Sequence, residues 1–321
     1  MAIVGGIDEA GYGPVLGPLV VSGVAFRVPD EQAGACLWDT LNGSVCSRMS
    51  GRNHRLVVAD SKKLYRSGDG LVSLERAALV MLEAAGYHPR TWRALLERLA
   101  ASQAIEALAA YPWYSGADLP LPFSATVADI GTRANAVRRD MQAHQVEFFG
   151  GFCEPLLAGQ FNALARATRN KSVVLVTLVM RIVDRIIRLA RGERVCVHID
   201  RLGGRQHYRE PLQTAFPSHA LRILEESSSR SAYRLASGAE VCEVEFVTGG
   251  EARRFPIALA SIYSKYLREL YMHAFNSYWS ERQTGLRPTA GYYTDAQRWL
   301  REAEPAIRRL TVERDMLVRS R

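Results

Sequence analysis

Two adjacent acidic residues, Asp8 and Glu9, stand at the end of an apolar run and are followed at once by glycines. Neighbouring side chains on a regular strand point to opposite faces. The pair can therefore share one site only if the strand ends or twists there, which Gly11 and Gly13 permit. Two clustered carboxylates repel each other unless a cation holds them, and hard divalent ions such as Mg²⁺ prefer oxygen ligands. The pair is either a metal-binding site or a solvated strand end.

Two further places in the sequence could complete a metal site. The run 194–200 alternates like a strand and ends on Asp200 just before two glycines, in the same arrangement as the first acidic pair. Further along, Ser261, Lys265 and Glu269 recur every four residues and share one face of a predicted helix. A lone Lys–Glu pair at this spacing is usually a surface ion pair, whereas beside a carboxylate cluster it would supply a phosphate contact and a metal ligand.

A dinucleotide-binding turn is the competing interpretation of the glycine-rich segment. Gly11, Gly13 and Gly17 imitate the G-x-G-x-x-G spacing, but the third glycine comes one residue late. The residues after Gly17 have the pattern of a strand, so no helix N-terminus would face the phosphates. We therefore set this interpretation aside.

The elements that must position these residues indicate a single α/β unit. Strands are predicted over 2–8, 17–28, 194–200, 240–248 and 253–257, and helices over 132–148, 154–168, 172–191 and 258–280. Strands first, helices in the middle, then strands and a terminal helical block favour a sheet with helices packed on it. No clean linker divides the chain.

The composition narrows the class of protein. The 321 residues include 48% hydrophobic and 23% charged residues, which is ordinary for a globular protein. Five widely spaced cysteines exclude a disulfide framework and a zinc knuckle, and they indicate a reducing compartment, so we expect a cytoplasmic protein. No apolar run is long enough for a membrane span. The net charge of +8 is compatible with a polyanionic partner such as nucleic acid.

Four motifs in order resemble the ribonuclease HII family. They are Gly-Ile-Asp-Glu-Ala-Gly-x-Gly-Pro-x-x-Gly-Pro over 6–18, Asp-Ser-Lys-Lys-Leu over 60–64, Ala-Ser-Ile-x-x-Lys over 260–265 with an acid four residues later, and Gly-Tyr-Tyr-Thr over 291–294. The resemblance implies a ribonuclease H-like fold, a mixed five-stranded sheet flanked by helices, with a C-terminal helical appendage. It implies a catalytic domain over 1–280, with a helical insertion at about 100–155 and a hairpin insertion at about 235–255, and a helical segment over 281–321.

The same resemblance implies an enzyme, an endonuclease that hydrolyses the RNA strand of RNA–DNA hybrids and leaves 3′-hydroxyl and 5′-phosphate ends. Two Mg²⁺ or Mn²⁺ ions would act there, and the partner would be a hybrid or a duplex DNA that contains ribonucleotides. We expect a monomer. The residues carried over as catalytic and metal-binding are Asp8, Glu9, Asp200 and Glu269. Those carried over as substrate-binding are Gly11, Tyr12, Gly13, Lys62, Lys63, Ser261, Lys265 and Tyr292.

Three departures from the family pattern leave alternatives open. Tyr12 stands where the family has arginine, Glu269 where it normally has aspartate, and Tyr293 where it has proline. A non-catalytic nucleic-acid-binding relative, or a nuclease acting on another structured nucleic acid, would also fit the sequence. The four acids in order favour the enzyme, since a pure binder has little reason to keep repelling carboxylates beside a polyanion.

Overall fold

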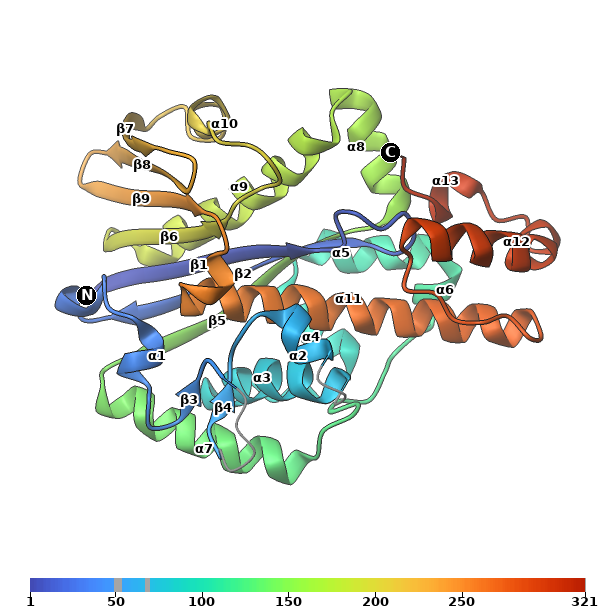
Figure 1. The fold of residues 1–321 in the computed structure, drawn as a ribbon, viewed down its shortest axis with the longest axis horizontal. Coiled ribbons are helices and arrows are strands. Elements are labelled where there is room, and N and C mark those ends of the chain that lie inside the picture. The colour runs from blue at the N-terminus through green and yellow to red at the C-terminus, as the bar shows by residue number, and fades with distance from the viewer. Residues whose placement is uncertain (49–53, 67–69, 321) are drawn as a thin grey trace.

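A computed structural model describes residues 1–48, 54–66 and 70–320. A mixed β-sheet crosses the centre of the molecule, and helices cover both of its faces (Figure 1). Over the described ranges no helix is both long and apolar enough to cross a membrane. The sheet and the two helical layers together position the candidate site.

The sheet has seven strands, and a short parallel pair stands apart from it. The strands of the large sheet are β1 (Ala2–Ala10), β2 (Leu19–Val28), β5 (Glu147–Leu156), β6 (Arg194–Asp200), β7 (Ala220–Glu226), β8 (Arg230–Ser237) and β9 (Glu240–Val247). The short pair is β3 (Val45–Cys46) and β4 (Leu56–Val57).

Helices make up most of the remaining chain. The α-helices are α1 (Leu37–Thr40), α2 (Ser61–Arg66), α3 (Leu71–Ala84), α4 (Trp92–Leu99), α5 (Ser102–Glu106), α6 (Pro112–Ser115), α7 (Val127–Ala143), α8 (Ala158–Thr168), α9 (Lys171–Ala190), α10 (Arg209–Ala215), α11 (Phe255–Arg282), α12 (Tyr293–Arg309) and α13 (Arg314–Leu317). Three 3₁₀ turns join them, η1 (Asp30–Gln32), η2 (Ala107–Ala110) and η3 (Gly250–Ala252).

The strand order β5-β2-β1-β6-β9-β8-β7 confirms the predicted mixed sheet flanked by helices, and the predicted helices at the C-terminal end are present as well. β1, β6 and β9 run parallel, while β2 is antiparallel to both β1 and β5. The sheet has two strands more than the five expected, because the antiparallel strands β7 and β8 extend it beyond β9. The central parallel strands therefore end together at one edge of the sheet.

Alternation along β1 divides the core between the two faces of the sheet. Ile3 and Ile7 pack with the buried face of α9, whereas Val4 belongs to the core around α11. α9 is amphipathic and α11 is largely buried along its length. Asp8 has the same parity as Val4, so its side chain lies on the α11 side of the sheet.

Two sequence-based predictions of secondary structure are wrong. The residues 147–156, placed in helices and the gap between them, form the edge strand β5, which accommodates Pro155 because an edge strand need not donate every backbone N–H. The residues 253–257 do not form a strand: α11 begins at Phe255, with Pro256 in its first turn. The division of the chain into domains stays a prediction.

Gly6 is the point of closest approach between β1 and α11. A Cβ atom there would lie 2.1 Å from the carbonyl carbon of Pro256 and 2.5 Å from the nitrogen of Ile257, both backbone atoms. We expect Gly6→Ala to lower the free energy of unfolding by about 2–3 kcal/mol, since the start of α11 must shift. Urea denaturation measures this as a lower midpoint at unchanged m-value.

Gly34→Ala is the matched control, because a Cβ atom at Gly34 meets nothing within 4 Å. Its midpoint should stay close to that of the parent. Equal midpoints for Gly6→Ala and Gly34→Ala would contradict the close packing of α11 on β1.

Candidate active site

Three parallel strands bring acidic residues to the same edge of the sheet. β1 pairs with β6 only as far as Ile7, and Asp8 and Glu9 lie just beyond that last pair. Asp200 is the last residue of β6, next to Val247 at the end of β9. The strands thus bring together three of the four acids that the sequence singled out. Asp8 is 6% exposed, while Glu9 and Asp200 are half-buried, so the cluster is not a fully solvated strand end.

A fourth acid, Glu251, joins this cluster and was missed by the sequence analysis. It lies in η3, directly after β9. The Asp200 carboxylate accepts a hydrogen bond of 2.7 Å from the backbone N–H of Gly250, which ties η3 to the end of β6. Glu251 follows its two glycines, whereas Asp8 and Asp200 precede theirs; an acid beside glycines at the end of an apolar strand is the signal that the three share.

Two serines fix the Glu251 side chain. Ser261 donates a short hydrogen bond to the Glu251 carboxylate, and the backbone N–H of Ser61 donates to the same oxygen at 3.3 Å. The hydroxyls of Ser61 and Ser261 lie 2.9 Å apart. The start of α2 and the second turn of α11 therefore meet at Glu251. Nearby on α11, the Ser264 hydroxyl donates to the backbone carbonyl of Asp8 at 2.9 Å.

Burial and mutual repulsion raise the pKa values of three of these carboxyl groups. Burial raises the pKa of Asp8 well above its usual value, and the charges of Glu9, Glu251 and Asp200 raise it further. The pKa of Glu9 is raised to about 7 by burial and by Asp200. Burial also raises the pKa of Asp200. A cluster of this kind needs a cation to become fully ionised at neutral pH.

Lys62 supplies part of that positive charge. Burial alone would lower the pKa of Lys62, but Glu251, Asp8, Asp60 and Asp200 raise it. Its charge in turn lowers the pKa of Glu9. One lysine offsets only part of four carboxylates, so charge balance leaves room for divalent cations.

The donor set fits hard divalent ions. All four side chains offer carboxylate oxygens, and the buried Oε2 atom of Glu9 has no hydrogen-bond partner among the described residues. In the part of the chain that is described, however, no three acidic, histidine or cysteine side chains already stand in a ligand arrangement. Binding an ion at the cluster would therefore require these side chains to move towards one another.

Glu269 lies outside the cluster. Its carboxylate accepts from Lys265 at 2.6 Å and from the hydroxyl of Tyr65 at 3.0 Å. Eight residues separate it from Ser261 along α11, which is about 12 Å of helix. Lys265 and Glu269 therefore form the i,i+4 ion pair that was the alternative interpretation of their spacing. Both side chains are mostly buried.

A hollow adjoins Glu251 on the side of Lys63. Its volume is about 470 Å³, and its lining includes Trp38, Arg48 and Lys63 together with Glu251. Lys63 stands in the first turn of α2, where its backbone N–H donates to Asp60 at 3.2 Å. The hollow thus combines an aromatic side chain with basic groups beside the acidic cluster.

The glycine-rich turn after β1 adjoins the cluster through Glu9 and Tyr12. Gly11 has a φ of 87°, and a Cβ atom there would lie 2.5 Å from the Nε atom of Arg268, so only glycine fits. Tyr12 is half-buried, and the ammonium of Lys171 lies 5.6 Å from its ring centroid. Gly13 has open space around it.

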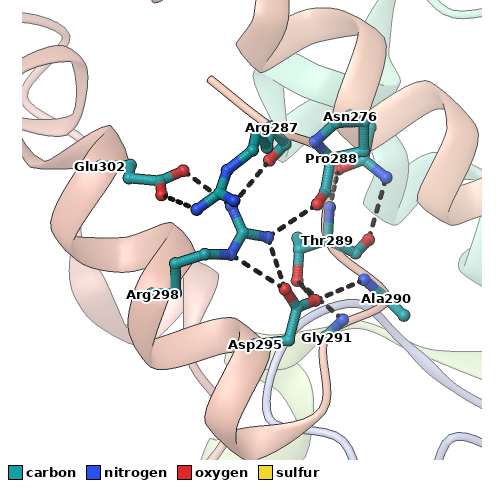
Figure 2. Close-up of polar contacts among 9 residues, drawn as sticks. All are labelled: Asn276, Arg287, Pro288, Thr289, Ala290, Gly291, Asp295, Arg298 and Glu302. Carbon is teal, nitrogen blue, oxygen red and sulfur yellow. Dashed lines mark hydrogen bonds and ion pairs between the residues drawn. The ribbon is translucent and has the colours of Figure 1, made fainter. Parts of the chain in front are cut away.

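A polar network fixes the segment 287–291 that precedes Tyr292 (Figure 2). Asp295 accepts hydrogen bonds from the hydroxyl of Thr289 at 2.6 Å and from the backbone N–H of Ala290 at 2.9 Å. The carbonyl of Gly291 then accepts from the backbone N–H of Val15 at 2.8 Å. Tyr292 is the next residue; it is 54% exposed, and the guanidinium of Arg268 lies 6.0 Å from its ring centroid.

Comparisons with known proteins find structural neighbours only. No protein-family model and no curated protein matches the sequence. The chain is similar to ribonuclease HII of Archaeoglobus fulgidus, solved in complex with PCNA, at 15% identity over 99% of this chain and 94% of that chain, with a TM-score of 0.42. It is similar to ribonuclease H2 of Pyrococcus horikoshii at 12% identity over 98% and 92%, with a TM-score of 0.45.

A third neighbour is Bst ribonuclease HIII in complex with Mn²⁺, at 14% identity over 99% of this chain and 66% of that chain, with a TM-score of 0.41. Identities and TM-scores this low carry no argument about activity. The three neighbours named here are a ribonuclease HII, a ribonuclease H2 and a ribonuclease HIII.

Proposed function

We propose that the protein is a metal-dependent endoribonuclease that cleaves the RNA strand of RNA–DNA hybrids, leaving 3′-hydroxyl and 5′-phosphate ends. The observation that carries this proposal is the meeting of Asp8, Glu9, Asp200 and Glu251 at the ends of three parallel strands, with raised pKa values for the first three. The substrate class rests on the four motifs.

We propose Glu251, rather than Glu269, as the fourth metal ligand. Two Mg²⁺ or Mn²⁺ ions bound by the four acids would activate the attacking water and stabilise the leaving 3′ oxygen. Ser261 and Ser61 orient Glu251, and Gly250 orients Asp200. Lys62 and Lys63 begin α2 next to the cluster and are placed to pair with phosphates, which fix the register of a nucleic acid.

The glycine-rich turn and Tyr292 are the proposed elements that recognise the substrate ribose. Backbone groups of Gly11, Tyr12 and Gly13 would contact the sugar, and the exposed Tyr292 ring would stack beneath it. Lys265 pairs with Glu269 in this structure, so its proposed phosphate contact requires it to leave that ion pair.

Cleavage mapping tests the function directly. We expect cuts in a uniform RNA–DNA hybrid with Mg²⁺ or Mn²⁺ and none in EDTA, with 3′-hydroxyl ends on the products. A duplex DNA with a single ribonucleotide, run in parallel, reports whether a junction is also cut. Metal-dependent binding without cleavage would support the non-catalytic relative, and cleavage of only a different nucleic acid would overturn the substrate class.

Tyr12 gives a separate prediction about substrate binding. We expect Tyr12→Arg to steepen the dependence of hybrid affinity on salt concentration, by about one unit of slope, because the new cation adds one phosphate contact. Affinity measured over a range of salt concentrations checks this. Tyr12→Phe is the matched control and should keep the parental slope. Equal slopes for all three proteins would contradict the expected phosphate contact of an arginine at this position.

A further inference from the structure

The segment after α12 is fastened to the glycine-rich turn. The backbone N–H of Arg319 donates to the carbonyl of Val15 at 2.8 Å, and Val318 forms a β-bridge with Leu16. Asn162 of α8 anchors the same segment: its amide donates to the carbonyl of Val318 at 2.8 Å, and its side-chain oxygen accepts from the backbone N–H of Ser320. The end of the described chain therefore returns to the residues just after β1.

The guanidinium of Arg319 lies directly against this turn. Its Nη2 atom donates short hydrogen bonds to the backbone carbonyls of Gly11 and Pro14. In a trans peptide the C=O and the N–H of the next residue point in opposite directions. Because the Gly11 carbonyl points at Arg319, the N–H of Tyr12 is directed away from Arg319.

Arg268 of α11 supports the turn from another direction. It donates to the carbonyls of Leu16 at 3.2 Å and of Ala290 at 3.0 Å, so it joins the turn to the loop before Tyr292. The proposed sugar-binding turn and the proposed stacking tyrosine are therefore held by two buried arginines, one from α11 and one from the terminal segment.

These arginines are costly to bury. Arg319 is 2% exposed, and within the described ranges it forms no ion pair with a carboxylate. Its Nε and Nη1 atoms have no hydrogen-bond partner there either. Burial, together with the charge of Arg268, lowers the pKa of Arg319 to about 9. A neutral side chain would fill the same space at lower cost, so packing alone does not account for an arginine.

We propose that Arg319 is a positioning residue of the substrate site: its guanidinium fixes the carbonyls of Gly11 and Pro14 inward, so that the turn presents the N–H of Tyr12 to the ribose and phosphate of the substrate. This inference rests on the proposed function. The segment 314–320 is then part of the recognition site and not only a covering of the fold. The positive charge behind the turn also favours an anionic ligand in front of it, through a medium of low dielectric constant.

The test combines steady-state cleavage of a hybrid with hydrogen exchange of the backbone amides of 10–18, using the full chain. We expect Arg319→Gln to raise KM about tenfold with kcat within about twofold, and to speed exchange in 10–18. Arg319→Lys should recover part of the affinity, because it keeps the charge but not the planar guanidinium that directs both hydrogen bonds. Asn162→Ala, which leaves Arg319 itself intact, should show the same pattern by releasing the segment.

Arg308→Gln is the matched control, because Arg308 is an exposed arginine of α12 that pairs with Glu304 on the same helix. It should leave both measurements unchanged. Parental KM and parental exchange in Arg319→Gln would overturn the inference while leaving the nuclease intact. Faster exchange with unchanged KM would equally overturn it, since Arg319 would then be purely structural. Absence of cleavage and binding in the parent would overturn the proposed function, and with it the role in substrate recognition, whatever the exchange data show.

Discussion

Asp8→Asn is expected to lower the cleavage rate of a hybrid by about 10³-fold or more. Removing a ligand of the proposed metal centre removes several kcal/mol of transition-state stabilisation, and each 1.36 kcal/mol is about a factor of ten in rate. Without metal the variant should be at least as stable as the parent, because burial and three neighbouring acids make the ionised Asp8 carboxylate unfavourable. Initial rates and thermal denaturation at neutral pH measure the two effects.

Adding Mn²⁺ separates a metal ligand from a merely buried acid. The parent should gain thermal stability with increasing Mn²⁺, because an ion that binds only the folded state stabilises it. Asp8→Asn should gain much less. Asp60→Asn serves as the control, because it removes a carboxylate that caps the start of α2 and lies outside the proposed ligand set. If Asp8→Asn cleaves as fast as the parent, the active site lies elsewhere.

Glu251→Gln is the second substitution with a large expected effect. We expect it to reduce the rate about 10²-fold or more, because it removes one charge from the cluster while keeping the hydrogen bonds that an amide oxygen can still accept. Glu269→Gln should stay within about threefold of the parent, because that carboxylate is engaged by Lys265 and Tyr65. Rates against Mg²⁺ and Mn²⁺ concentration for the three proteins distinguish the two residues.

The reverse order of effects would restore the sequence-based prediction. If Glu269→Gln is inactive and Glu251→Gln is not, α11 presents its later turn to the metals, and Glu251 is a structural partner of the two serines. If both substitutions have small and equal effects, the metal ligands are Asp8, Glu9 and Asp200 alone.

Three of the four clustered acids could be located from the sequence because each stands where an apolar strand meets glycines. Strand periodicity placed Asp8 and Asp200 at equivalent ends, and parallel pairing of β1 with β6 then brings them together. Glu251 escaped because the two glycines after β9 favour a hairpin turn when the sequence is considered alone. In the structure the residues from Gly250 onward form a 3₁₀ turn and the start of α11.

Long-range contacts explain most of what the sequence could not predict. β5 contains two glycines and a proline and becomes a strand only by pairing with β2. Likewise nothing near Arg319 in the sequence indicates its contact with Gly11, which lies 308 residues away. Such positions are set by tertiary packing, which overrides local propensity.

Anomalous diffraction from crystals of the full chain grown with Mn²⁺ and a hybrid would locate the metal centre itself. We expect Mn²⁺ density between Asp8, Glu9, Asp200 and Glu251, with two ions roughly 3.5–4 Å apart when substrate is bound. Glu269 should remain with Lys265. Mn²⁺ density at Glu269 with none at Glu251, or no Mn²⁺ at the ends of β1, β6 and β9, would contradict the proposed metal centre.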